Sequence, residues 1–244
     1  MLEGKTAVVT GGSRGIGRSI VERLSRDGVS VVFSYAGNED AAAEVLRSVE
    51  ANGSRAHAVR ADLVHPDAAE QLMQAAHSHL GNLDILVNNA ALAYAPAPLA
   101  NSDTSDFDKV MAVNTRSVFL TMRYAAKHLR DGGRIVNIST SLTARALPAM
   151  ALYLASKGAI EQLTAVAAQE LGSRAITVNA VSPGPTATDM MRDNTPPEAL
   201  EAMAAMSPFG RLGQPADLAD VVAFLASDDG RWITGQNLRV TGGA

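Results

Sequence analysis

Short runs of apolar and β-branched residues recur seven times along the chain, separated by stretches with helical spacing. The runs cover residues 6–10, 29–34, 55–61, 84–88, 134–139, 176–181 and 238–240. Between the first two runs, Ile20 and Leu24 share one helical face, and Asn52-Gly53 closes the next helical stretch. This alternation predicts parallel strands joined by right-handed crossovers, with helices on both faces of the sheet. We therefore predict an α/β fold with a doubly wound parallel sheet of about seven strands.

The length and composition of the chain favour one domain. Its 244 residues, 47% of them hydrophobic, can bury a large core, and α/β folds of this length often remain single domains. No repeat or linker interrupts the pattern, so we predict one domain over residues 1–244. The long stretch at about 186–214 has no predicted strand and contains prolines and methionines, which is typical of a flap over a binding site.

Composition also narrows the range of partners. Cysteine is absent and the five histidines are scattered, so we predict neither a disulfide framework nor a metal site. A net charge of −4 without a Lys/Arg cluster gives no electrostatic reason to expect nucleic acid or a membrane surface. We expect a small-molecule partner. The first residues show no signal-peptide pattern and no apolar stretch is long enough to span a bilayer, so the expected location is cytoplasmic.

A glycine-rich turn follows the first predicted strand, at residues 10–17 (Thr-Gly-Gly-Ser-Arg-Gly-Ile-Gly), and an amphipathic helix follows the turn. Glycines at 11, 15 and 17 permit a tight turn, close approach to a pyrophosphate, and close packing of helix on strand. The helix then offers its free N–H groups to the phosphates. Because this glycine-rich turn lies in the first strand-to-helix unit of the chain, it predicts a Rossmann-type dinucleotide site. Its predicted contacts from this turn are Gly11, Ser13, Arg14, Gly15, Ile16 and Gly17.

The same residues also fit the G-x-S-x-G pattern of a serine hydrolase, with Ser13 as the nucleophile. That mechanism requires an acid and then a histidine further along the chain. No histidine occurs after His128, which precedes the fifth predicted strand. The required order cannot be completed, and the hydrolase hypothesis is disfavoured.

Tyr153 and Lys157 lie four residues apart at the start of a predicted helix and share one face. A free tyrosine ionises near pH 10, so it transfers protons poorly at neutral pH unless a nearby cation stabilises the phenolate. Lys157 can supply that cation. The same spacing also occurs as an ordinary pair on an amphipathic helix, so only neighbouring motifs give it a catalytic meaning.

Four motifs occur in a fixed order: the glycine turn, residues 88–91 (Asn-Asn-Ala-Ala), the Tyr153/Lys157 pair, and Pro183-Gly184. In this order the chain resembles the short-chain dehydrogenase/reductase family over essentially its whole length. Within this family, the chain most resembles the members that are like 3-oxoacyl-[acyl-carrier-protein] reductases and those that are like trihydroxynaphthalene reductases. The resemblance implies an oxidoreductase that transfers hydride between a nicotinamide and a carbonyl or secondary alcohol.

The resemblance also implies roles for individual residues. Tyr153 would protonate the developing alkoxide, and Lys157 would lower the pKa of Tyr153 and hydrogen-bond the nicotinamide ribose. Asn114 would hold a water in the proton relay. The family usually has a serine where this chain has Thr140, whose hydroxyl can still donate to the carbonyl oxygen. A small change in the loop would present Ser141 instead.

The predicted cofactor is NADP(H). No carboxylate occurs between residues 33 and 38, where an enzyme that uses NAD usually has one. Arg14 is placed to pair with a 2′-phosphate, and the end of the second strand can donate hydrogen bonds to it. The predicted contacts there are Ser34, Tyr35 and Asn38. By resemblance the remaining cofactor contacts are Asp62, Leu63, Asn88, Ala90, Pro183, Gly184, Thr186 and Thr188, and Asp62 equally suits capping of its own turn.

The predicted substrate wall is apolar and rich in methionine, which suits an irregular hydrophobic ligand such as a ketone or a 3-oxoacyl thioester. Its residues are Leu92, Ala93, Tyr94, Leu147, Met150, Met190, Met191, Met203, Met206 and Phe209. Arg130 and Arg174 are candidates for attracting an acyl-carrier protein. By resemblance we expect a homotetramer. A competing hypothesis is a regulator that binds NADP without catalysis, and the set of Asn114, Tyr153 and Lys157 argues against it.

Overall fold

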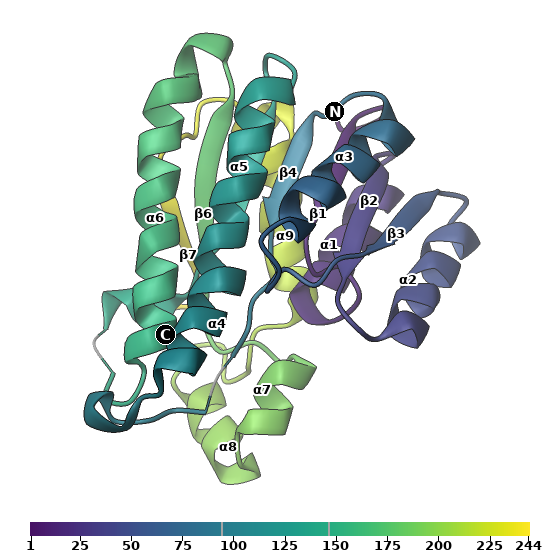
Figure 1. Cartoon of the computed structure of the whole chain (residues 1–244). Helices are drawn as coiled ribbons and strands as arrows, with labels where there is room; N and C mark the ends of the chain where they lie inside the picture. Colours follow the sequence, from purple (N-terminus) through teal and green to yellow (C-terminus); the bar gives the residue numbers. More distant parts are fainter. Residues whose placement is uncertain (94, 146) are drawn as a thin grey trace.

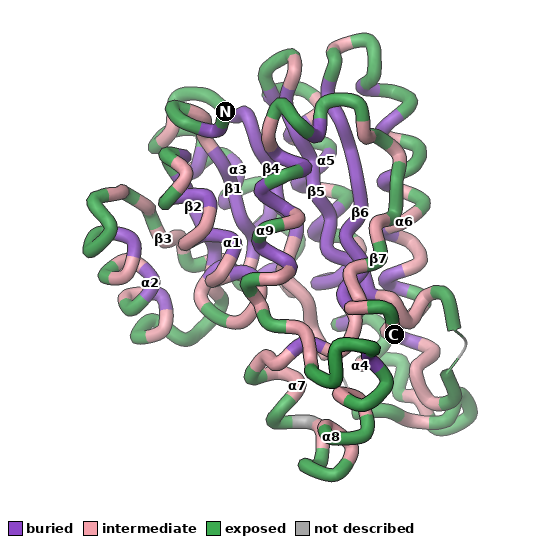
Figure 2. The backbone as a smooth tube through the Cα atoms, turned by 180° about the vertical axis from the view of Figure 1, so that it is seen from behind, coloured by how far each residue is buried: buried purple, intermediate pink, exposed green. Residues whose placement is uncertain are grey.

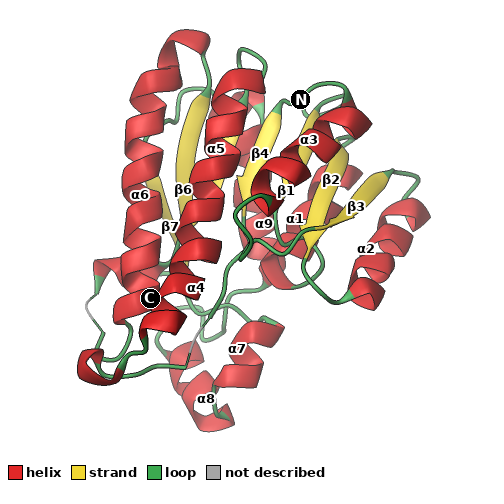
Figure 3. Ribbon diagram, viewed as in Figure 1, coloured by secondary structure: helices red, strands yellow, loops and turns green. Residues whose placement is uncertain are grey.

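A single parallel sheet forms the centre of the molecule in the computed structural model, which describes residues 1–93, 95–145 and 147–244 (Figures 1 and 3). Its strands follow the order β3-β2-β1-β4-β5-β6-β7 and all neighbours are parallel. The strands are β1 (Thr6–Val9), β2 (Ser30–Tyr35), β3 (Ala56–Arg60), β4 (Ile85–Asn88), β5 (Arg134–Ile138), β6 (Thr177–Pro183) and β7 (Asn237–Val240). The order reverses direction between β1 and β4, where doubly wound folds bind their ligands.

Helices cover both faces of this sheet, which confirms the predicted fold class (Figure 1). They are α1 (Gly15–Arg26), α2 (Glu39–Ala51), α3 (Ala68–Leu80), α4 (Thr104–Met111), α5 (Ser117–His128), α6 (Ala151–Leu171), α7 (Asp189–Asn194), α8 (Pro197–Ala205) and α9 (Pro215–Ala226). None of the helices in the described part of the chain is long and apolar enough to cross a membrane.

The core lies on the two faces of the sheet as two separate layers, seen as buried strands in Figure 2. Ala7 and Val9 of β1 join α1, α2 and α9 in one layer, whereas Val8 joins α3, α5 and α6 in the other. Successive side chains of a strand point to opposite faces, so a strand covered on both faces needs apolar residues throughout. This explains why the strand runs are continuous apolar stretches.

The predicted strands all exist, with ends that differ by one or two residues. The largest extension is in β6, which continues to Pro183 because Ser182 and Pro183 pair with Arg239 and Val240 of β7. Stretch 186–214 has no named strand but contains α7 and α8, which the sequence did not predict. These two helices extend beyond the body of the molecule in Figure 1, and those of their residues whose burial the structure describes are half-buried or exposed in Figure 2.

Both ends of this stretch are fixed to each other. Thr186 forms a parallel bridge with Gly213, and two backbone hydrogen bonds close it: Ala187 N donates to Gly213 O at 2.8 Å, and Gly213 N donates to Pro185 O at 2.9 Å. Further along, Ser207 Oγ donates to Gly242 O at 2.9 Å. The two ends of stretch 186–214 therefore lie next to each other on the body of the molecule.

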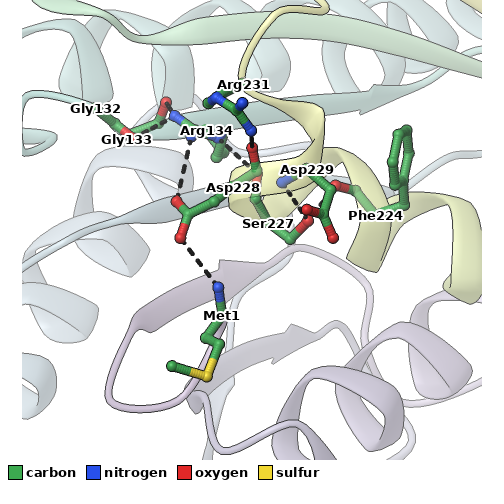
Figure 4. Close-up of polar contacts among 9 residues, drawn as sticks. All are labelled: Met1, Gly132, Gly133, Arg134, Phe224, Ser227, Asp228, Asp229 and Arg231. Atoms are coloured by element: carbon green, nitrogen blue, oxygen red, sulfur yellow. Dashed lines mark hydrogen bonds and ion pairs between the residues drawn. The ribbon is translucent and has the colours of Figure 1, made fainter.

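The amino end of β5 is fixed by Arg134, whose side chain is only 8% exposed. Its guanidinium donates to Gly132 O, Gly133 O and Ser227 O (Figure 4). Asp228 lies 3.8 Å from Arg134 Nη2 and accepts a hydrogen bond from the amino group of Met1 at 3.0 Å. Burial lowers the pKa of Arg134, while Asp228 opposes that effect. These contacts join the start of β5 to the turn after α9.

Replacing Ala175 with glycine is expected to stabilise the protein. Ala175 is exposed and has a φ of +54° at the end of a short 3₁₀ turn. A left-handed alanine is strained, so glycine should raise the free energy of unfolding by about 0.5–1 kcal/mol after its own entropy cost. Urea unfolding measures the change. Ala165→Gly, at an exposed position inside α6, should lower it by about the same amount, and equal effects of the two variants would contradict the explanation.

Candidate active site

The glycine turn leads from β1 into α1 at the carboxyl edge of the sheet. Gly11 has a φ of +66°, and its N–H donates to Ser34 Oγ at 3.1 Å. A Cβ on Gly17 would lie 2.1 Å from Gly11 O, so any other residue there would push the helix away from the turn. Gly12, which sequence reasoning did not single out, is equally constrained because its Cβ would lie 2.6 Å from Phe33 Cβ. Sterically, the turn requires glycine at these positions.

Asn89 holds the turn from the neighbouring strand and was missed by sequence reasoning. Its Nδ2 donates to Thr10 O at 3.0 Å and to Gly11 O at 2.9 Å, and its backbone N–H donates to Thr10 Oγ1 at 2.9 Å. The available indication was its position directly after β4, beside the strand that precedes the turn. Asn89 therefore fixes the turn across the point where the strand order reverses.

Asn88 lies inside the protein, where its side chain joins a polar network. It is 2% exposed, its Nδ2 donates to Asn137 Oδ1 at 2.8 Å, and its Oδ1 accepts from Thr121 Oγ1 at 2.7 Å. Asn137 Nδ2 in turn donates to Thr164 Oγ1 at 2.9 Å. The side chain thus connects β4 to β5 and α5. Its predicted contact with the cofactor stays a prediction, with the backbone rather than the side chain available for it.

The predicted 2′-phosphate contacts lie around the turn after β2, with one correction. Ser34 is 1% exposed and its oxygen accepts the Gly11 N–H, so it supports the glycine turn rather than facing a surface ligand. Asn38 caps α2 by accepting the Ala41 N–H at 2.9 Å, which leaves its amide N–H groups as donors. Arg14 is exposed and makes no ion pair with any described residue. Tyr35 is half-buried at the end of β2.

Asp62 and its neighbours border the same edge. Asp62 Oδ1 accepts the Val64 N–H at 3.1 Å, so the carboxylate caps its own turn, and the residue stays half-exposed. Leu63 is buried in a small cluster under this turn, with Ala90 packed against it. A Cβ on Gly11 would lie 2.9 Å from the Cα of Ala90, which brings the β4 loop against the glycine turn. Ser13 and Ile16 are half-buried within the turn itself.

The segment after β6 closes over the glycine turn. Gly184 passes so near Thr241 that a Cβ would lie 2.9 Å from its Cα. Thr186 is buried and its Oγ1 donates to Gly184 O at 2.8 Å. Thr188 caps α7, and its Cγ2 lies 3.3 Å from the position that a Cβ on Gly15 would take. The structure therefore brings Thr188 beside the glycine turn, and Pro183, Gly184 and Thr186 precede it in the same segment.

Tyr153 and Lys157 lie at the start of α6, which brings them to the carboxyl end of β5. Lys157 is 2% exposed, and its Nζ donates to Ile138 O at 2.8 Å. The same Nζ lies 5.9 Å from the centre of the Tyr153 ring. Burial lowers the pKa of Lys157 from 10.5 to about 8, because the protein interior disfavours the charged form. The lysine therefore loses its proton at a lower pH than an exposed lysine does.

Burial raises the pKa of Tyr153, and the hydrogen bond to Thr140 partly opposes this effect. The sequence predicted that Lys157 lowers this pKa. That effect stays a prediction: Lys157 is directed to the Ile138 carbonyl, and the contribution that opposes burial comes from Thr140. Thr140 is thus the hydroxyl that contacts the tyrosine. Ser141, the alternative, begins the next 3₁₀ turn and has no such contact.

Asn114 is buried in a short π-helical turn, Ala112–Arg116, between α4 and α5. Its Oδ1 accepts the Leu92 N–H at 2.7 Å, and its Nδ2 donates to Leu92 O and Ser156 Oγ, both at 3.1 Å. Such turns occur frequently at functional sites. The side chain fixes the loop after β4 against α6. Its predicted role of holding a water stays a prediction.

The predicted substrate wall lies around this edge on exposed or half-buried side chains. Leu147, Met206 and Phe209 are 42%, 52% and 73% exposed. The other described members are half-buried, namely Leu92, Ala93, Met150, Met190, Met191 and Met203. Tyr94 lies outside the described residues. The wall is therefore accessible to an apolar ligand.

Arg130 and Arg174 lie at the opposite, amino-terminal edge of the sheet. Arg130 Nη1 is 3.6 Å from Asp84 Oδ1, and Arg174 Nε donates to Asp131 Oδ1 at 2.7 Å. Arg174 also donates to two carbonyls at the end of α5. A carrier protein docked there would face away from Tyr153. The two arginines therefore no longer support an acyl-carrier protein as a partner.

Together the fold and these contacts define a dinucleotide-dependent oxidoreductase site, with a glycine turn, a half-buried tyrosine and a buried lysine. A sequence model described as enoyl-(acyl carrier protein) reductase matches residues 11–244. The chain is 43% identical over 251 residues to a short-chain type dehydrogenase/reductase of Picea abies, covering 99% of this chain and 93% of that protein. The chain belongs to the short-chain dehydrogenase/reductase family of oxidoreductases.

Two other similar proteins are a versicolorin reductase and an angucycline ketoreductase. A versicolorin reductase of Emericella nidulans is 41% identical over 255 residues, covering 100% of this chain and 96% of that protein. The solved structure of an angucycline C-6 ketoreductase with bound NADP has a TM-score of 0.93 and 44% identity, covering 99% of this chain and 96% of that chain. The similarity extends over the whole site.

Proposed function

We propose that this chain is an NADPH-dependent ketoreductase in which Tyr153 donates the proton. The observation that carries the proposal is the placement of Tyr153 beside the Thr140 hydroxyl, which opposes the rise of its pKa, with Lys157 buried one helical turn away. Two hydroxyls on one carbonyl oxygen stabilise the charge that develops there. Lys157 hydrogen-bonds the nicotinamide ribose and changes the electrostatics around the tyrosine. Asn114 supports the site by fixing the β4 loop to α6.

The glycine turn fits the pyrophosphate of NADPH, because the positions of Gly11 and Gly17 exclude any side chain. The N–H groups at the start of α1 bind the phosphates. Arg14 pairs with the 2′-phosphate, and Asn38 donates an amide hydrogen bond to it, in a loop without a carboxylate up to Glu39. Asp62 contacts the adenine, while Thr186 and Thr188 contact the carboxamide and the nearby phosphate. When bound, NADPH supplies the hydride.

The proposed substrate is a hydrophobic, polycyclic ketone. The accessible wall that includes Met150, Met191 and Phe209 is apolar and adaptable. The versicolorin reductase is similar in sequence, and the angucycline ketoreductase is similar in both sequence and fold. Stretch 186–214, carrying α7 and α8, is the flap that covers this substrate, since these helices lie between the bridged residues Thr186 and Gly213 and contribute no residue to the two large core layers.

The proposed assembly is a homotetramer in the cytoplasm. An apolar groove runs along the outer face of α4, α5 and α6, and its lining includes Met111, Leu163 and the exposed Phe119 and Val166. A second copy of the chain would cover this face. Sedimentation of the purified protein gives the oligomeric state.

NADPH oxidation followed by absorbance tests the function, with quinones, polycyclic ketones, 3-oxoacyl thioesters and an enoyl thioester as substrates. We expect turnover of ketones with NADPH preferred over NADH. Arg14→Ala should raise the KM for NADPH about 10–100-fold, since a hydrogen-bonded charge on phosphate is lost, and should leave the KM for NADH unchanged. Arg55→Ala, an exposed arginine at the far end of β3, is the control. NADPH binding without turnover of any carbonyl would support the regulator instead.

A further inference from the structure

Glu161 lies one helical turn beyond Lys157 on α6. Its Oε1 accepts two hydroxyl hydrogen bonds, from Ser139 Oγ at 2.8 Å and from Thr143 Oγ1 at 2.6 Å. These two donors flank Thr140 in the chain. Hydroxyl bonds to a carboxylate are short and about twice as strong as neutral ones. One glutamate therefore holds the segment on both sides of the threonine that contacts the tyrosine.

The contacts inside this segment transmit the position of its ends to Thr140. Thr143 Oγ1 also lies 2.9 Å from Thr140 O, and Leu142 N–H donates to Thr140 Oγ1 at 3.3 Å. On the other side, Ser139 N–H donates to Val181 O of β6 at 2.8 Å. The direction of the Thr140 hydroxyl is thus set by a turn that binds α6 through the Glu161 carboxylate and, at a longer distance of 3.5 Å, through Ser139 Oγ and Lys157 O.

We propose that Glu161 is a positioning residue, which holds the turn so that Thr140 Oγ1 meets both the Tyr153 hydroxyl and the substrate carbonyl. Glu161 itself touches neither of these groups. Since threonine has two heavy atoms on Cβ, its side chain adopts few rotamers, and the hydroxyl direction depends on where the backbone is held. The inference rests on the proposed function, because it assigns Glu161 a part in that same reaction.

Three variants separate positioning from simple stabilisation. Glu161→Gln keeps an oxygen that accepts both hydroxyls. Glu161→Leu removes that acceptor and leaves the buried Ser139 hydroxyl without it. The triple variant Ser139→Ala/Thr143→Val/Glu161→Leu removes both hydroxyl donors as well. No donor is then left without its carboxylate acceptor, but the turn is still not bonded to α6 at residue 161. Glu170→Leu, at an exposed position on the same helix, is the matched control.

For the best ketone in the NADPH assay, we expect kcat to fall about 10–100-fold in both Glu161→Leu and the triple variant, as a displaced catalytic hydroxyl implies. The KM and the Kd for NADPH should stay within about twofold, because the glycine turn is untouched. Glu161→Gln should retain most of kcat, and Glu170→Leu all of it. Thermal melting should show the triple variant closer to the starting protein than Glu161→Leu.

A triple variant with normal kcat would overturn the inference, and so would a change confined to melting temperature. If the triple variant does not fold, Thr143→Val gives the same test at a half-buried position, with several-fold loss of kcat expected and unchanged kcat contradicting the inference. Failure of the proposed function appears separately, as absence of ketone turnover in the unsubstituted protein.

Discussion

Tyr153→Phe is expected to lower kcat for ketone reduction by a factor of about 10²–10⁴, the usual contribution of a positioned general acid. The substitution removes only the hydroxyl, whose pKa Thr140 lowers against the effect of burial. Phenylalanine keeps the ring, so the contact between the ring and the Lys157 ammonium is retained. The Kd for NADPH should be unchanged, because the glycine turn lies on β1 and α1 rather than on α6.

Stopped-flow single turnovers measure the chemical step, and NADPH fluorescence measures binding. Tyr124→Phe is the matched control, since Tyr124 lies on α5 and stacks on His128 at 4.0 Å, away from the site. It should leave kcat unchanged. A Tyr153→Phe protein with kcat within threefold of the starting protein would contradict the assignment of the proton donor. Loss of NADPH binding would instead show that the tyrosine mainly supports the cofactor site.

The sheet could be predicted because its central strands are buried on both faces. Burial on both faces requires continuous apolar runs, and Val8, Val9 and Val87 illustrate such runs in β1 and β4. The crossover rule then limits how such strands connect. Helices α7 and α8 were not predicted because they contribute no residue to the two large core layers. Without a buried face, the sequence shows no strong helical periodicity there.

The glycine turn and the Tyr153/Lys157 pair could be predicted because each is a local motif. The residues that hold them act across long separations in sequence: Asn89 bonds Gly11, 78 residues away, and Ser139 bonds Glu161, 22 residues away. No periodicity or spacing connects such pairs. The role of Ser34 was also misjudged, since the sequence does not tell whether a hydroxyl near a strand end points inward or outward.

Lys157 should make the stability of the cofactor-free protein depend on pH between 7 and 9.5. Its pKa is about 8 in the folded protein against 10.5 for an exposed lysine. Below pH 8 both states carry the ammonium, and the cost of burying it is fully present. As pH rises above 8, the folded protein loses this proton while the unfolded chain keeps it. The unfolded state then binds more protons, so the free energy of unfolding rises with pH.

The size of this effect is measured against Lys157→Met, which keeps the volume of the side chain and cannot ionise. The difference in free energy of unfolding between the two proteins, from urea titrations at equal protein concentration, should grow by roughly 2 kcal/mol from pH 7 to pH 9.5 in favour of the lysine protein. Subtracting the two proteins cancels the other titrating groups and the lost bond to Ile138 O. A constant difference would show that the ammonium is not buried at a cost. A rising one, together with loss of ketone reduction in the variant, would show that the protein retains a destabilising buried charge because the reaction needs it.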